Sequence, residues 1–206
     1  ITVRLVGSEM CIRDRPIEKI KDDCIIAWAM NGEALRPEQG YPVRLVVPGW
    51  EGNMWVKWLR RIEFGDKPYM TREETSKYTD LLSDGKARMF TWVMDAKSVI
   101  TSPCPEKPVL QKGIHQIRGL AWSGRGKIKR VDVSLDGGKN WKTAQLHSPV
   151  LEKSLTRFTI PFEWNGEEML LQSRAIDETN YVQPTIKELQ NTVSYTHLTL
   201  PTSKIV

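Results

Sequence analysis

The chain has 206 residues, of which 40% are hydrophobic and 27% charged, enough apolar material for one large domain or two small ones. Its net charge of +5 is too low to indicate nucleic-acid binding, and no apolar run approaches the roughly 20 residues that span a bilayer. We therefore expect no nucleic acid and no membrane as partners. The three cysteines and three histidines are scattered, so we expect no zinc site built from protein ligands.

The two ends differ in character from the rest of the chain. Residues 1–15 lack the apolar segment and cleavage site of a signal peptide. Both this stretch and residues 191–206 resemble peptides translated from sequencing-adaptor DNA. We therefore expect two non-native tails that pack poorly, with ordinary disordered tails as the alternative.

Short strands separated by turns are predicted for residues 16–95. Apolar runs at 24–30 and 41–47 favour strands, and each is closed by a turn dipeptide, Asn-Gly or Pro-Gly. A two-residue alternation over 56–64 indicates another strand. A Thr-x-x-Glu capping box at 71–74 predicts a helix of about two turns.

The pattern becomes all-β after a proline-rich stretch that ends at Pro108. Apolar runs or alternation predict strands at 114–122, 131–135, 158–162 and 169–176. Several short strands joined by turns favour a β-sandwich. Its core is expected to contain Trp122, Val131, Val133, Leu135, Phe158 and Ile160.

Two motifs in this half have both a structural and a functional interpretation. Residues 134–141 fit the Ser-x-Asp-x-Gly-x-x-Trp pattern of sialidase propellers, but a propeller would repeat it in every blade. We interpret it as a hairpin in which Asp136 accepts turn N–H groups and Trp141 covers the turn. The basic cluster at 125–130 could bind nucleic acid. A solvated strand face is the better interpretation, because aromatic and basic residues do not interleave over a wider surface.

A possible anion site lies in the first half. Arg44 sits in an apolar strand and Lys57 follows a glycine-containing turn. Fixed cations together with turn N–H groups are what a phosphate-bearing ligand needs. Two surface cations at strand ends are an equally good reading of the residues alone.

Several motifs, occurring in order, resemble the sulfite-oxidase family of molybdenum enzymes over about residues 24–187. They are MNGEALR (30–36), PEQGYPVRLVVPGW (37–50), VKWLRRIE (56–63), AWSGRGKIKRVDVSLDGGKNW (121–141) and LLQSRAIDETNYVQP (170–184). Within the family, residues 71–103 are most similar to the molybdenum subunit of sulfane dehydrogenase. The resemblance implies a mainly β fold. Residues 16–95 would be the end of an α+β molybdopterin domain, and residues 96–190 an immunoglobulin-like dimerisation domain.

The same resemblance implies site residues. Arg44 and Lys57 would bind the molybdopterin phosphate, and Trp55 and Val56 would add backbone contacts. Gln39 stands where animal sulfite oxidases have a histidine. Arg157 resembles an arginine that the dimerisation domain directs to the oxyanion pocket, where a fixed cation would hold an anionic substrate.

For the complete enzyme, the resemblance implies molybdenum-dependent oxidation of sulfite or carrier-bound sulfane sulfur in the periplasm. Its partners would be a second copy of the chain, a cytochrome c that takes the electrons and, for carrier-bound sulfane sulfur, a sulfur carrier protein. Cys24 and Cys104 do not match the family's molybdenum-ligating cysteine, so we expect this stretch alone to be inactive. The alternative is a stand-alone immunoglobulin-like interaction module with no redox role.

Overall fold

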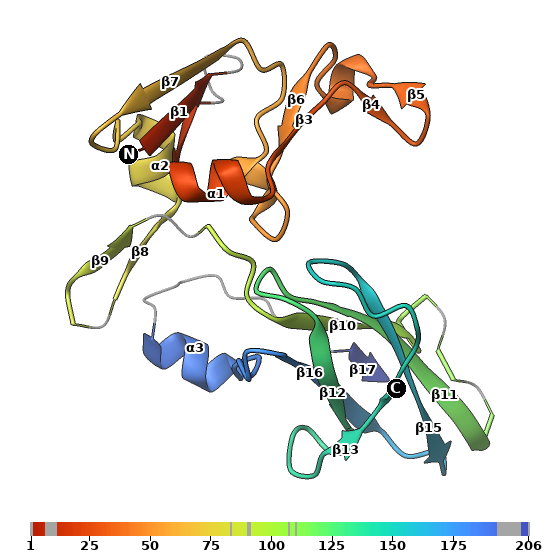
Figure 1. Ribbon diagram of the computed structural model, residues 1–206. Helices are drawn as coiled ribbons and strands as arrows, with labels where there is room; N and C mark the ends of the chain where they lie inside the picture. The colour runs from red at the N-terminus through yellow and green to blue at the C-terminus, as the bar shows by residue number, and fades with distance from the viewer. Residues whose placement is uncertain are drawn as a thin grey trace. The chain divides into compact units, whose positions relative to one another are not determined.

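The computed structural model of the chain describes residues 2–6, 12–82, 84–89, 92–106, 108–109, 111–192 and 203–205. The chain divides into two compact units, Ile1–Val93 and Met94–Val206 (Figure 1). Strands predominate over helices in the part described, as the sequence predicts. Among these residues, no helix is both long enough and apolar enough to cross a membrane.

The first unit contains short strands and small sheets. Strand β1 (Thr2–Val6) lies between β2 (Ile12–Pro16) and β7 (Arg61–Gly65), and three antiparallel pairs complete the strands. These pairs are β3 (Ile25–Ala27) with β6 (Arg44–Val46), β4 (Ala29–Met30) with β5 (Glu33–Ala34), and β8 (Thr79–Leu81) with β9 (Ala87–Met89). The helices are α1 (Ile17–Asp22), α2 (Arg72–Lys77), and two 3-10 turns at Pro37–Gln39 and Gly52–Met54.

A small apolar core holds this unit together. Its buried members are Leu45, Val47, Trp50, Met54 and Val56. The ring of Trp50 stacks on Trp92 with centroids 5.0 Å apart, which extends the core by one aromatic layer. The core is built around β6 and the segment that follows it, the region with the predicted anion-binding residues.

Part of the predicted N-terminal tail is placed in the fold. Strand β1 pairs on both of its edges, and Arg15 is fully buried and donates a hydrogen bond to the carbonyl of Met54. The backbone of these residues is thus paired within the fold, and the expectation that both ends are non-native tails stays a prediction. At the other end, β17 (Ser203–Ile205) pairs with β16 (Met169–Asp177), while 193–202 and 206 lie outside the described residues.

The strand predicted over 56–64 is shorter than its alternation suggests. Val56 is buried, and its carbonyl accepts the Leu45 amide at 2.8 Å, so this segment first runs beside β6. Trp58 then has a φ of 52°, which interrupts extended backbone. Strand β7 therefore begins only at Arg61. The helix predicted from the capping box is confirmed as α2, with Thr71 directly before it.

The second unit is a two-sheet sandwich. One sheet has the order β10 (Lys97–Ser102), β11 (Gly113–Trp122), β15 (Thr156–Trp164) and β14 (Gln145–Leu146). The other has the order β13 (Lys142–Thr143), β12 (Ile128–Ser134), β16 and β17. Helix α3 (Ile186–Thr192) follows the last long strand (Figure 1).

Both sheets contribute to one continuous core. Ile117 and Phe158 come from one sheet and Val131 and Leu171 from the other, and all four are 0% exposed. Of the predicted core residues, Val131, Val133 and Phe158 are buried, whereas Trp122, Leu135 and Ile160 are only half-buried. The predicted β-sandwich is confirmed, and its immunoglobulin-like character stays a prediction.

The hairpin between β12 and β13 forms as its sequence predicts. Asp136 accepts the amides of Asn140 at 2.9 Å and Lys139 at 3.1 Å, as well as the Ser134 hydroxyl. These hydrogen bonds, that from the Asn140 amide above all, hold the pKa of Asp136 well below its ordinary value. The Trp141 indole closes the turn by donating to the Gly138 carbonyl at 3.0 Å. This motif is structural.

Candidate cofactor-binding site

The candidate site is built on a tight turn at residues 36–40. The Gln39 side chain accepts the Arg36 amide at 2.9 Å, and the Gly40 amide donates to the Pro37 carbonyl at 3.1 Å. Gly40 ends the turn with a φ of 110°, a left-handed conformation that favours glycine. The side chain of Gln39 thus caps its own turn, and its expected contact with the cofactor stays a prediction.

Three consecutive carbonyl groups of this turn accept hydrogen bonds from three side chains. The Pro37 carbonyl accepts the Trp58 indole at 3.0 Å. The Glu38 carbonyl accepts the Lys57 ammonium at 2.7 Å, and the Gln39 carbonyl accepts the Arg44 guanidinium at 2.9 Å. The turn therefore fixes the positions of both predicted phosphate-binding cations, although they are remote from each other in the sequence.

Gly40 allows the residues that bear these two cations to pack closely against the turn. A Cβ added to Gly40 would lie 3.0 Å from the Cβ of Lys57, 3.1 Å from its Cα and 3.2 Å from the Cβ of Arg44. Residues 44 and 57 therefore pack against the same glycine. The absence of a side chain at residue 40 is what allows the turn and the two cation-bearing segments to meet.

Trp55 and Val56 lie in the same cluster. The Trp55 indole donates to the Trp50 carbonyl at 3.2 Å, and the Arg44 guanidinium lies 5.5 Å from the Trp55 ring centroid. This distance is within the range of a cation–π interaction. The side chain of Val56 is buried in the core. The structure thus brings together all five residues proposed from the sequence, Gln39, Arg44, Trp55, Val56 and Lys57.

The cations retain donors for an anion. Burial lowers the pKa of the Arg44 guanidinium below the ordinary value of an arginine. Its Nε is buried and has no hydrogen-bond partner in the part of the chain described. Lys57 has three N–H donors, of which the Glu38 carbonyl takes one. A phosphate group, with several acceptor oxygens and negative charge, fits this donor set.

Arg157, the sixth predicted site residue, belongs to the second unit. It lies on β15 opposite Leu120 of β11, and its side chain is exposed. Its carbonyl accepts the His147 amide at 2.9 Å, which fixes the backbone at this position. The role of Arg157 toward a substrate stays a prediction.

Sequence reasoning missed two residues that help to form the candidate site, Gly40 and Trp58. Glycine directly after the Pro-Glu-Gln turn was a usable signal, because such a position often needs a left-handed residue. The role of Trp58 had no sequence signal, since its contact with residue 37 depends on the fold. Among the described residues, no group of three His, Cys, Asp or Glu side chains could hold a metal ion.

Comparison with known proteins agrees with this division into two units. Residues 4–73 match the family described as the oxidoreductase molybdopterin binding domain. Residues 88–198, more than half of the chain, match the Mo-co oxidoreductase dimerisation domain.

Individual relatives give the same picture. The chain is 34% identical to sulfite oxidase of Gallus gallus, over 79% of this chain and 38% of that protein. It is 31% identical to an NADH nitrate reductase of Solanum lycopersicum, over 79% of this chain and 21% of that protein. The crystal structure of the sulfane dehydrogenase SoxCD from Paracoccus pantotrophus matches with 59% identity and a TM-score of 0.88, covering 93% of this chain and 50% of that one.

The chain thus spans half or less of the length of these relatives. The two matched domains occur in this order, and they correspond closely to the two units of the structure. The chain belongs to the sulfite-oxidase family of molybdenum-cofactor oxidoreductases.

Proposed function

We propose that the chain is part of a molybdenum enzyme that oxidises sulfite or carrier-bound sulfane sulfur. Its first unit would hold the phosphate of molybdopterin, and its second would contribute to substrate binding and to a homodimer. The observation that carries the proposal is that Arg44 and Lys57 both pack against Gly40 and both donate to carbonyls of the same turn. Two fixed cations with unused donors suit a phosphate dianion.

The residues of the first unit have distinct parts in this proposal. Arg44 would bind the phosphate with its buried Nε or its remaining terminal N–H groups, and Lys57 with the donors that the Glu38 carbonyl does not use. Trp55 covers the Arg44 guanidinium, which limits its exposure to water. Gln39 and Gly40 shape the turn that orients both cations.

When bound, the molybdenum cofactor supplies oxygen transfer to sulfur, with the oxygen derived from water. Arg157 would hold the anionic substrate through charge-assisted hydrogen bonds, for which its guanidinium is exposed and suited. Electrons would leave to a cytochrome c, and the substrate would be sulfite or sulfane sulfur on a carrier protein. We place the enzyme in the periplasm as part of this proposal.

Two alternative functions are less well supported. A stand-alone interaction module would not need the segment that matches the molybdopterin-binding family at residues 4–73. Nitrate reduction is known for relatives that are 31% identical, whereas the sulfane dehydrogenase match is 59% identical. The higher identity favours a sulfur substrate over nitrate.

The test compares Arg44→Ala and Arg157→Ala in the complete enzyme. Arg44→Ala should lower the molybdenum and molybdopterin content per protomer by roughly tenfold or more, because a charged hydrogen bond contributes about 1.5–3 kcal/mol. Arg157→Ala should leave this content intact and lower kcat/KM for sulfite by a similar factor in a cytochrome c reduction assay. Lys21→Ala, an exposed cation on α1, is the matched control and should change neither quantity.

The roles proposed for the two arginines fail if Arg157→Ala empties the cofactor site while Arg44→Ala leaves it full. Turnover of nitrate in preference to sulfite would contradict the proposed substrate class. For the 206-residue chain alone, we expect no stable molybdenum and no sulfite-dependent cytochrome reduction. Stoichiometric metal in that chain, measured by elemental analysis, would contradict this expectation.

A further inference from the structure

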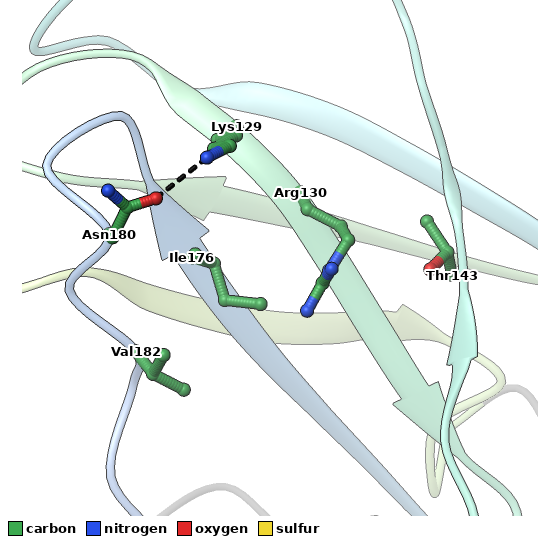
Figure 2. Close-up of a pocket in the computed structure, with 6 residues that line it drawn as sticks. All are labelled: Lys129, Arg130, Thr143, Ile176, Asn180 and Val182. Atoms are coloured by element: carbon green, nitrogen blue, oxygen red, sulfur yellow. Dashed lines mark hydrogen bonds between the residues drawn. The ribbon is translucent and has the colours of Figure 1, made fainter.

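A charged hollow lies on the outer face of the β13-β12-β16 sheet in the second unit. It has a volume of about 460 Å³, within the range of small-molecule pockets. Its lining residues are Lys129, Arg130, Thr143, Ile176, Asn180 and Val182 (Figure 2). None of the six is acidic. The hollow combines two cations with an aliphatic surface.

Strand register places the central residues of the hollow. Arg130 of β12 is the direct partner of Ile176 of β16, and Ile176 forms a bridge with Val182 on its other side. Directly opposed residues in neighbouring strands project from the same sheet face. The guanidinium-bearing residue and the two aliphatic residues are therefore held side by side by backbone pairing.

A β-bulge adds the second cation. The register of β12 and β16 shifts between Ile128 and Arg130, so Lys129 is an extra residue with no partner on β16. Consecutive strand residues normally point to opposite faces, and a bulge re-aims one of them. Here Lys129 and Arg130 are both exposed, while Ile128 and Val131 on either side are buried. The bulge thus puts two adjacent cations at one hollow.

Each cation is oriented but keeps free donors. Asp132 is 4% exposed and binds the Nε of Arg130 at 3.0 Å. It also accepts Arg174 at 3.2 Å, so one carboxylate faces two guanidinium groups. The terminal nitrogens of Arg130 make no hydrogen bond within the described residues. Lys129 donates to the neutral Asn180 amide oxygen at 2.7 Å, the contact drawn in Figure 2.

One carboxylate, that of Asp132, is shared between Arg130 and Arg174, and Lys129 contacts only a neutral amide oxygen. The carboxylate of Glu178, in the adjacent turn, accepts the Lys127 amide at 3.0 Å. Val182 is 47% exposed beside the cations, so an apolar group that covered it would gain by burial. Ile176 beside it is only 6% exposed, so Val182 supplies most of the open aliphatic surface. A purely inorganic anion would satisfy the arginine and leave Val182 exposed to water.

We propose that this hollow binds a small organic monocarboxylate, with the carboxylate on the terminal nitrogens of Arg130 beside Lys129. The apolar body would lie over Ile176 and Val182. The planar guanidinium matches a carboxylate through two parallel hydrogen bonds. The site is independent of the proposed cofactor site, because all of its residues belong to the second unit.

The test uses the full chain with benzoate as the probe, at low ionic strength so that charges are not screened. Titration followed by NMR should show shifts at residues 129–130, 176 and 182, with a Kd on the order of 1–10 mM for so small a ligand. Benzamide, of the same shape but uncharged, should bind at least tenfold more weakly. Inorganic phosphate should also bind more weakly than benzoate.

Two variants test the charged part and the apolar part of the site separately. Arg130→Gln should weaken benzoate by about tenfold, and Val182→Ser by about fivefold, through loss of the charged pair and of the apolar contact respectively. Lys139→Gln, an exposed cation in the Asp136 hairpin, should have no effect. The proposal is overturned if benzamide or phosphate binds as tightly as benzoate. It is also overturned if both folded variants, checked by circular dichroism, retain the affinity of the original chain.

Discussion

The two units of this protein are held together in different ways. The second has two four-stranded sheets and a core in which both sheets bury aliphatic and aromatic side chains completely. The first has short strand pairs and a small core, and large apolar side chains such as Trp28 and Ile26 are more than half exposed. Its candidate site is organised by hydrogen bonds from side chains to the carbonyls of one turn.

This contrast shows how stability and function divide between the units. Packing of two complete sheets makes the second unit robust to small changes on its surface. In the first unit, a single glycine and three carbonyl groups set the positions of the functional cations. Small changes there should alter binding geometry with less effect on the fold.

The largest change in unfolding free energy is expected from Phe158→Ala in the second unit. Phe158 is 0% exposed at the centre of the sandwich, and its truncation should cost about 3–5 kcal/mol of unfolding free energy. Ile114→Ala on neighbouring β11 is the control. Ile114 is 81% exposed, so its cost should stay within about 0.5 kcal/mol. Urea unfolding combined with hydrogen exchange would measure both. If hydrogen exchange in the first unit rose equally, the two units would unfold together. The proposed difference in how each unit is stabilised would then be wrong.

A smaller effect is expected from Gly40→Ala in the first unit. Alanine at residue 40 would have to adopt a φ of 110°, and its Cβ would meet Lys57 and Arg44. Together these should cost about 1–3 kcal/mol of unfolding free energy. Gly32→Ala is a matched control, because Gly32 also has a positive φ, 83°, but nothing within 4 Å of its Cβ position. Thermal unfolding gives the stability of each variant.

In the complete enzyme, only Gly40→Ala should also lower molybdopterin content, measured by pterin fluorescence. Equal loss in both variants would mean that backbone strain alone matters at residue 40. The crowding of Arg44 and Lys57 would then have no role in retaining the cofactor.

Acid should weaken the second unit through Asp136. Its folded-state pKa is depressed below the ordinary value of about 3.9 by hydrogen bonds from Asn140, Ser134 and Lys139. A depressed pKa contributes stability that is complete above pH 4 or so and is lost as the pH falls toward the folded-state pKa. Asp136→Asn should therefore lower stability at pH 7 and flatten the loss below pH 4, as measured by urea unfolding across pH. An unchanged slope would contradict this.

The smallest change in stability is expected from Trp28→Ser in the first unit. Trp28 is 71% exposed, so its replacement should alter unfolding free energy by no more than about 0.5 kcal/mol. It should nevertheless reduce binding of an apolar dye and self-association, because it removes part of an exposed apolar surface that includes Ile25, Ile26 and Met30. A large loss of stability would show that Trp28 packs more tightly in solution than its exposed fraction of 71% indicates.

Local sequence patterns predicted the structure correctly where one short segment determines its own conformation. The Asp136 hairpin, the strands of the sandwich and the start of α2 follow from turn chemistry, alternation and capping. The same alternation was misleading over 56–64. There, hydrogen bonds to the segment around β6 and the positive φ of Trp58 override a two-residue period. Tertiary contacts decide such cases because periodicity records which residues are apolar and not which backbone groups pair.

Sequence by itself indicated an anion site at Arg44 and Lys57 no more strongly than it indicated two ordinary surface cations. The family resemblance assigned these two residues to the cofactor and added Gln39, Trp55, Val56 and Arg157. Only the tertiary structure showed that residues 44 and 57 both pack against Gly40 and that the turn carbonyls orient their cations. Lys129 and Arg130, interpreted from sequence as an ordinary strand face, became a candidate site because the register shifts at this point of β12 and both residues are exposed and line one hollow. The physical reason is the same in each case. Residue type is encoded locally, whereas the approach of two charged side chains depends on backbone pairing with segments distant in sequence.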